Sequence, residues 1–144
     1  MDELDERLAR LAPLAGKPRA DFDADPYLRD IVERNLEIAA QCCIDVSHRV
    51  ISLQRAQQPH DYHEAILRLG ELGILDPDLA RRLAPVSGLR NVLAHEYIGV
   101  DWDEVIRSLG ELDDLRLFGE QVRVWLLSRD EDSIAGRSGQ GGSN

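Results

Sequence analysis

The longest regular pattern of hydrophobic and polar positions lies between residues 27 and 57. Apolar residues recur there in steps of three and four, close to coiled-coil spacing: Val32, Leu36, Ala39, Cys43, Val46, Val50 and Leu53. This spacing predicts one long helix with a buried face, ended before Pro59. A second face carries a polar row, namely Asp30, Arg34, Glu37, Gln41, Asp45 and His48. The row is either a solvated face or one wall of a groove or dimer interface.

Four more helices are predicted from the same spacing and from residues that start and stop helices. They cover residues 2–15, 62–72, 77–95 and 102–128. Aspartates that suit helix N-caps precede the last three of them. Residues 16–25 are predicted to form a loop, because Pro13, Gly16 and Pro18 break the preceding helical pattern.

The end of the chain differs in composition from the rest. Residues 130–144 are mostly Gly, Ser, Asp and Glu, which predicts a mobile, disordered tail. No segment reads as a strand, and no glycine-rich nucleotide-binding loop is present in the sequence. The expected organisation is therefore an all-α antiparallel bundle of about five helices over residues 1–129, followed by the tail at 130–144.

Composition and charge restrict what this bundle binds. The 144 residues are 43% hydrophobic and 31% charged, as in a globular domain, and the formal net charge is −10. Non-specific electrostatic binding of nucleic acid over the whole surface is not expected from such a chain. RNA would need a local basic groove, for which Arg34, Arg81, Arg82 and Arg90 are candidates; otherwise the acidic faces suit a basic protein partner.

The cysteines and the hydropathy of the sequence indicate in which cellular compartment the protein is expected. Cys42 and Cys43 are adjacent within a helical pattern, so their side chains diverge and a disulfide between them is not expected. Free thiols fit a reducing cytoplasm. The sequence contains neither a signal peptide nor an apolar run long enough to span a membrane. We therefore expect a cytoplasmic protein without a membrane partner.

The segment from Arg90 to Tyr97 carries the chemistry expected for attack on a phosphodiester without a metal. Arg90 can grip phosphate oxygens and stabilise developing charge. His95 can accept a proton from a ribose 2′-hydroxyl or donate one to the leaving oxygen. Its position at a helix C-terminus favours the cationic imidazole. Tyr97 can position the phosphate or serve as a hydroxyl that another enzyme modifies.

The spacing of these residues bears on oligomeric state. Positions 90 and 95 are about 140° apart on a continuous helix, so their side chains do not converge on one atom. Either the helix unwinds near His95, or groups from two subunits form the active centre. A symmetric dimer achieves the second, with one histidine as base and the other as acid. Taken alone, the trio also fits an ordinary structural role, with Arg90 in a surface ion pair.

The combination Arg-x4-His-x-Tyr on the penultimate predicted helix resembles the HEPN superfamily of ribonucleases, and more narrowly the HepT toxin family. The similarity extends to Glu33–Asp45 and to Tyr62–Leu75, and covers roughly residues 27–126. It implies a HEPN-type helical bundle that is homodimeric and cuts RNA, including transfer RNA, without a metal. Residue by residue, the family's arginine, histidine and tyrosine fall on Arg90, His95 and Tyr97.

The resemblance also implies a partner. HepT-like toxins are neutralised by a minimal nucleotidyltransferase antitoxin, which transfers AMP from ATP to the motif tyrosine, here Tyr97. ATP and magnesium would belong to that partner, so no cofactor and no metal are expected for this chain. An adenylyl group on Tyr97 would place negative phosphate beside Arg90 and exclude the RNA phosphate. Asn91, Arg34 and Asp45 are the expected supporting residues.

Other readings of the chain remain. A non-catalytic helical module that binds a nucleotidyltransferase would keep the same shape, and a small-ligand sensor is a further alternative. His60 and His63 form a His-x-x-His pair at a helix start, but a metal site would need further ligands. The leading hypothesis is a metal-independent endoribonuclease toxin with Arg90, His95 and Tyr97 as catalytic residues.

Overall fold

A computed structural model describes residues 2–55, 57–95 and 102–141, and within these ranges every regular element is a helix. The elements are α1 (Asp2–Leu11), the 3-10 helix η1 (Ala12–Leu14), α2 (Arg19–Ala24), α3 (Pro26–Leu53), α4 (Tyr62–Glu71), α5 (Pro77–Leu83), α6 (Val86–His95), α7 (Trp102–Leu109) and α8 (Leu112–Gly141). The all-α prediction is confirmed.

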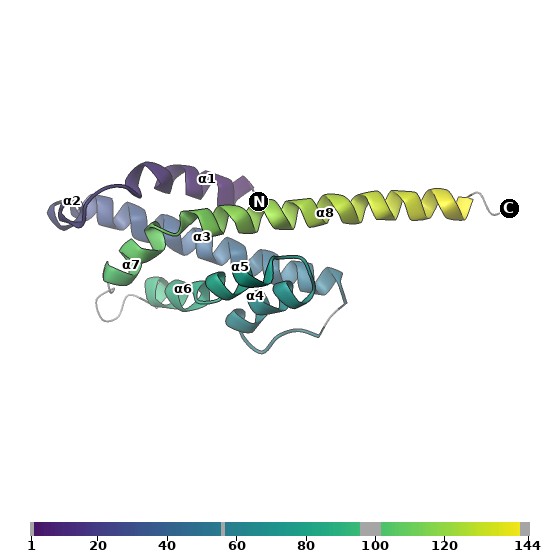
Figure 1. The fold of residues 1–144 in the computed structure, drawn as a ribbon. Coiled ribbons are helices and arrows are strands. Elements are labelled where there is room, and N and C mark those ends of the chain that lie inside the picture. The colour runs from purple at the N-terminus through teal and green to yellow at the C-terminus, as the bar shows by residue number, and fades with distance from the viewer. Residues whose placement is uncertain (1, 56, 96–101, 142–144) are drawn as a thin grey trace.

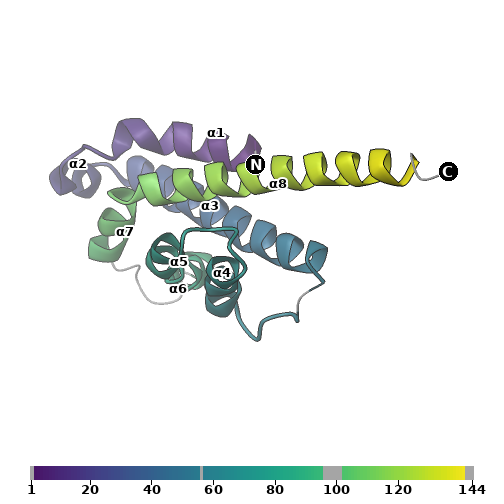
Figure 2. The same cartoon turned by 45° about the vertical axis from the view of Figure 1, so that its right-hand side comes forward.

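The long helix α3 is the centre of the bundle. Its N-terminus is capped by Asp25, whose carboxylate accepts hydrogen bonds from the backbone N–H groups of Tyr27 and Leu28, and Pro26 occupies the first turn. Helices α1 and α8 lie along α3, while α4, α5 and α6 form a cluster on another side of it (Figures 1 and 2). Beyond the bundle α8 continues as a projecting helix.

Two hydrophobic clusters fill the bundle. One joins the C-terminal half of α3 to α4, α5 and α8, and Phe118 of α8 lies fully buried in it. The other joins the N-terminal half of α3 to α2, α6 and α7, where Leu36 of α3 belongs to the same cluster as Leu89 and Leu93 of α6. Burial of these leucines holds α6 against α3. The second cluster therefore sets the position of the segment that carries Arg90.

The structure corrects three of the predicted boundaries. The segment 16–25 is not a loop throughout, because residues Arg19–Ala24 form α2 and bury Phe22 against Trp102, with ring centroids 5.7 Å apart. The predicted helix 77–95 is two helices that break before Pro85, whose ring removes a backbone donor. The predicted helix 102–128 is also two helices, separated at Gly110. The prediction of about five helices was thus too low.

The predicted tail differs as well. Residues 130–141 continue α8 in the structure, so the backbone there is helical rather than irregular. This part of α8 projects past the other helices (Figure 1). The domain boundary near residue 129 stays a prediction.

Helices α4 and α5 pass so close at Gly70 that a side chain there would collide with α5. A Cβ atom added at Gly70 would lie 2.9 Å from Cβ of Ala80 and 3.4 Å from Cα of Pro77, whereas one added at Gly88 of α6 would meet nothing within 4 Å. Both Gly→Ala changes gain similar helix propensity. We expect G70A to be less stable than G88A by about 1–3 kcal/mol, because overpacking costs that much. Urea unfolding curves at one protein concentration measure the difference, and equal stabilities would contradict it.

Candidate active site

Arg90 lies on α6 and reaches across to α3. Its side chain is half-buried, and its Nε donates a hydrogen bond of 2.6 Å to Oε1 of Gln41. The neighbouring Leu89 and Leu93 are only 5% and 2% exposed, which fixes the rotation of α6 about its own axis. The burial of these two leucines therefore directs Arg90 toward the polar face of α3.

That polar face lines a groove that Arg90 also enters. The groove has a volume of about 310 Å³ and lies among α1, α3 and α6. Its lining is formed by Glu3, Arg34, Glu37, Ile38, Gln41, Cys42, Asp45 and Arg90. Four members of the polar row predicted on α3 are among these residues. The structure thus brings the predicted supporting residues Arg34 and Asp45 together with Arg90 in one groove.

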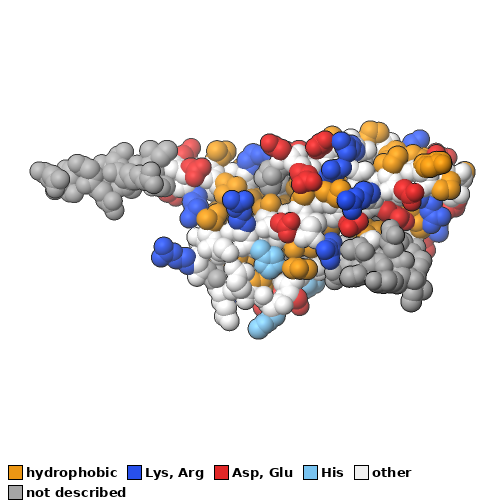
Figure 3. Space-filling model, turned by 180° about the vertical axis from the view of Figure 1, so that it is seen from behind, with side chains coloured by type: hydrophobic (Ala, Val, Ile, Leu, Met, Phe, Trp, Pro, Cys, Tyr) orange, Lys and Arg blue, Asp and Glu red, His pale blue; other side chains and the backbone are white. Residues whose placement is uncertain are grey.

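The charges in the groove are mixed. Three carboxylates face two guanidinium groups among its lining residues. Arg34 pairs with Glu37, with 3.5 Å between Nη1 and Oε2, and Nε2 of Gln41 donates to Oδ1 of Asp45 at 2.8 Å. Acidic and basic side chains also alternate over the described part of the rear face of the molecule (Figure 3). Contact with a polyanion would therefore depend on individual arginines and not on a broad basic field.

The four arginines that were candidates for a basic groove do not line one groove in the structure. Arg81 pairs with Asp78 within α5, and Arg82 pairs with Asp114 of α8 at 3.2 Å. Neither residue lines the groove that holds Arg90 and Arg34. The helix break before Pro85 separates α5 from α6, so arginines that are close in sequence lie in different places.

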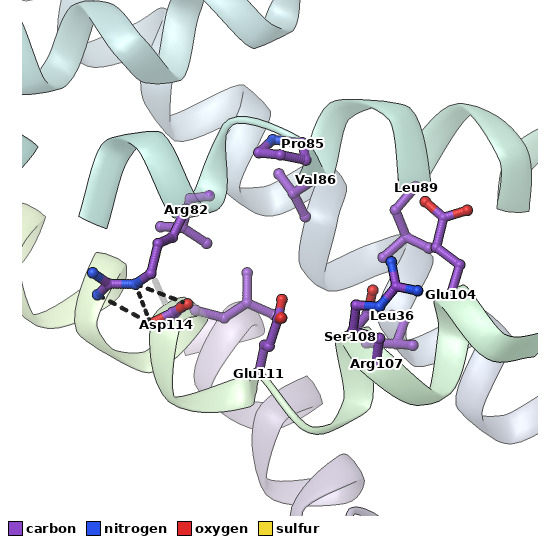
Figure 4. A pocket seen from close by; sticks show the side chains of 12 residues that line it. Leu36, Arg82, Pro85, Val86, Leu89, Glu104, Arg107, Ser108, Glu111 and Asp114 are labelled. Atoms are coloured by element: carbon purple, nitrogen blue, oxygen red, sulfur yellow. Dashed lines mark hydrogen bonds and ion pairs between the residues drawn. The ribbon is translucent and has the colours of Figure 1, made fainter. Parts of the chain in front are cut away.

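Arg82 instead borders a separate small pocket (Figure 4). The pocket lies among α5, α6, α7 and α8, with a volume of about 110 Å³. Leu36, Val86 and Leu89 are among its apolar lining residues, and the ion pair of Arg82 with Asp114 stands at one end. Pockets that hold drug-sized ligands typically measure about 300–1,000 Å³. This pocket is therefore too small for a nucleotide.

The backbone of Asn91 and His95 belongs to α6, which stays helical from Arg90 to His95. Tyr97 lies outside the described residues, as do the side chains of Asn91 and His95.

The remaining histidines lie away from the groove. His60 and His63 are exposed at the start of α4, and His48 contacts the ring of Tyr62 edge-on with centroids 5.4 Å apart. In the described ranges no three or more His, Cys, Asp or Glu side chains stand close enough to bind a metal ion together. The structure thus adds no third ligand to the His-x-x-His pair among the residues that it describes.

The two cysteines are free thiols, as expected from their adjacent positions. Cys42 lines the groove, and burial together with the nearby carboxylate of Glu3 raises its thiol pKa. Cys43 is fully buried in the core, and burial raises its pKa further. Both thiols therefore stay protonated near neutral pH, which makes them poor nucleophiles.

Sequence reasoning placed Gln41 only in the polar row and did not assign it a role. Its spacing of four residues from Asp45 was a local signal, because an i, i+4 pair of this kind forms a hydrogen bond on a helix surface. The contact with Arg90 joins residues 49 positions apart. Only the packing of α3 against α6 creates it.

No helix within the described ranges combines the length and the apolar character that a membrane crossing requires. This agrees with the hydropathy of the sequence.

The chain is similar to known proteins in sequence and in fold. The family described as "Ribonuclease HepT-like" matches residues 4–122. A tRNA nuclease HepT from Aphanizomenon flos-aquae is 34% identical over 119 residues, which covers 78% of this chain and 81% of that protein. An mRNA nuclease HepT from Shewanella oneidensis is 25% identical over 106 residues, covering 73% and 80% of the two chains.

A solved structure shares the architecture. The tri-AMPylated HEPN toxin of Shewanella oneidensis, in complex with an MNT antitoxin, superposes with a TM-score of 0.75 at 22% identity, covering 85% of this chain and 92% of that one. The HEPN-type helical bundle is therefore confirmed. With a family match along most of its length and a nuclease relative of 34% identity, the chain belongs to the HepT-like ribonuclease family.

Proposed function

We propose that this protein is a toxin endoribonuclease that cuts transfer RNA without a metal, in the cytoplasm, and that a nucleotidyltransferase antitoxin silences it. The observation that carries the proposal is the placement of Arg90 in a polar groove, on the same helix as His95 and five positions before it. Family membership supports RNA as the substrate. The relative named a tRNA nuclease is more similar than the one named an mRNA nuclease, which favours transfer RNA.

The proposed reaction is an in-line displacement at phosphorus. The ribose 2′-oxygen forms a bond to phosphorus, the bond from phosphorus to the 5′-oxygen of the next nucleotide breaks, and a 2′,3′-cyclic phosphate and a 5′-hydroxyl result. One His95 imidazole accepts the 2′-hydroxyl proton, and an imidazolium protonates the leaving oxygen. Arg90 stabilises the charge that develops on the phosphoryl oxygens. Tyr97 positions the phosphate, and Asn91, Arg34 and Asp45 support the groove.

A homodimer completes this site in the proposal. Positions 90 and 95 are about 140° apart on a helix, and α6 remains helical between them. Unwinding between these residues therefore does not bring them together. A twofold axis beside α6 would bring two copies of the motif to one substrate and would supply both an acid and a base.

Regulation by the antitoxin acts at Tyr97. The Shewanella oneidensis toxin in the comparison is AMPylated and bound to an MNT antitoxin, which supports the same partner here. Transfer of AMP from ATP to the Tyr97 hydroxyl forms a phosphodiester and releases pyrophosphate. The added phosphate would compete with RNA for Arg90. ATP and Mg²⁺ are bound by the antitoxin in this scheme.

The alternative is a helical module that binds the antitoxin without cutting RNA, and cleavage in the presence of EDTA separates the two. We expect the purified protein to cut bulk transfer RNA in EDTA and to leave 2′,3′-cyclic phosphate ends, because the proposed chemistry uses only side chains. Gel analysis with end-specific labelling measures both the cut and its product. R90A is the control for a contaminating nuclease. Intact RNA after prolonged incubation would favour the interaction module, and a strict need for Mg²⁺ would contradict the mechanism.

A further inference from the structure

Gln41 occupies a place in the groove that the proposed reaction does not yet use. Its side-chain oxygen accepts the hydrogen bond from Nε of Arg90 at 2.6 Å, and its side-chain nitrogen donates to Asp45 at 2.8 Å. The three residues thus form a chain that runs from α6 to α3 and then one turn along α3. We propose that Gln41 is a positioning residue, which holds the guanidinium of Arg90 in the orientation that cleavage requires; this rests on the proposed function.

The direction of the Gln41 amide is set by Asp45. An ionised carboxylate only accepts hydrogen bonds, so the NH₂ group of Gln41 must face Asp45. The amide oxygen then faces Arg90, which only donates. Asp45 therefore acts through Gln41, and this gives the predicted supporting residue a specific task.

The atom that Gln41 contacts also matters. A guanidinium is planar, and its two terminal nitrogens form the edge that pairs bidentately with phosphate. Gln41 contacts Nε, so this hydrogen bond restrains the group from its inner side and does not itself occupy the Nη1–Nη2 edge. Rigid placement of such a group should raise the cleavage rate strongly, because a displacement of about 1 Å at a reacting centre lowers the rate about 100-fold.

A neutral amide suits this position better than a carboxylate. In the same groove Arg34 is paired with the charged Glu37, and Glu3 and Asp45 add further negative charge. A glutamate at position 41 would keep the hydrogen bond to Nε, but it would neutralise part of the charge that attracts the RNA phosphate. The amide of Gln41 orients the Arg90 guanidinium and, being uncharged, does not neutralise its positive charge.

The test compares three variants in steady-state cleavage of transfer RNA in EDTA. Q41L should lower kcat about 10- to 100-fold, with KM changed less than about threefold, because an interaction that matters in the transition state is lost. Q41E should retain more of kcat than Q41L but show a higher KM, since the carboxylate opposes the phosphate. Q57L is the matched control, because Gln57 is exposed and lies outside the groove, and it should match the wild type.

An NMR measurement detects the hydrogen bond between Arg90 and Gln41 independently of RNA cleavage. The Nε–H signal of Arg90 in a ¹⁵N–¹H correlation spectrum, assigned by its absence in R90K, should exchange slowly with water in the wild type and in Q41E, and rapidly in Q41L. Melting temperatures of all variants exclude unfolding as the cause, because α3 and α6 are joined mainly by their buried leucines.

The outcomes separate the inference from the proposed function. If the wild type cuts RNA and R90K does not, but Q41L retains full kcat, the positioning role is wrong while the nuclease proposal stands. Equal protection of the Arg90 signal in Q41L and wild type would also overturn the role. A wild-type protein that cuts no RNA overturns both, since Gln41 then has no reaction to serve.

Discussion

Replacing His95 with alanine is expected to lower the rate of transfer RNA cleavage by about 10²- to 10⁴-fold, the usual contribution of a general acid or base. In the proposed dimer the change removes both the base that accepts the 2′-hydroxyl proton and the acid that protonates the leaving oxygen. Initial rates of cleavage in EDTA measure the loss, and growth arrest on expression should disappear in parallel.

His63 offers a matched control for this experiment. It is exposed at the start of α4 and lies outside the groove, so H63A should cut at the wild-type rate. Circular dichroism should show H95A to be as helical as the wild type, because removal of a side chain at the end of a helix leaves both hydrophobic clusters intact. Full cleavage by folded H95A would remove His95 from the mechanism.

Replacing Phe118 with alanine is expected to lower the free energy of unfolding by about 3–5 kcal/mol, the usual cost of a buried phenylalanine. Phe118 is 0% exposed and belongs to the cluster that joins α8 to α3, α4 and α5. The lost contacts and the cavity left behind both contribute. Domains typically have about 5–15 kcal/mol of stability in total, so F118A should lose a large part of its stability. Urea unfolding at a fixed protein concentration measures the change.

Val124 on the same helix provides the comparison. Its side chain is 67% exposed, and V124A should stay within about 0.5 kcal/mol of the wild type, as surface changes usually do. A loss in F118A no larger than that in V124A would mean that α8 does not pack as described. Fixed concentration matters because dimerisation would add to the apparent stability of every variant.

The central helix shows how far the sequence alone reaches. The apolar seam on residues 32–53 predicts a long helix, and α3 covers Pro26–Leu53. Helical periodicity and capping are local properties, so the sequence reveals them directly. The predicted helix 77–95 shows the limit, because its apolar spacing continues through the break at Pro85. The apolar positions of two successive helices therefore give the same sequence pattern as one continuous helix.

The short helix α2 shows a different limit. Its six residues carry one buried aromatic side chain, Phe22, which is too little for a periodic pattern. Such a segment becomes helical because the stacking of Phe22 on Trp102 anchors it. Isolated helices of this length are unstable in water. Tertiary contact therefore decides its conformation.

For the candidate site, the sequence by itself determined the all-helical class, the Arg-x4-His-x-Tyr spacing with its angular separation, and the polar row on the long helix. These depend on residue types and on the helical repeat, which are local. The tertiary structure alone decided that Arg90 meets Gln41 across 49 positions and that Arg81 and Arg82 lie elsewhere. The first outcome depends on how Leu36, Leu89 and Leu93 pack α6 onto α3, because the burial of apolar area between distant segments sets which polar side chains become neighbours. The second depends on the helix break before Pro85, which separates α5 from α6.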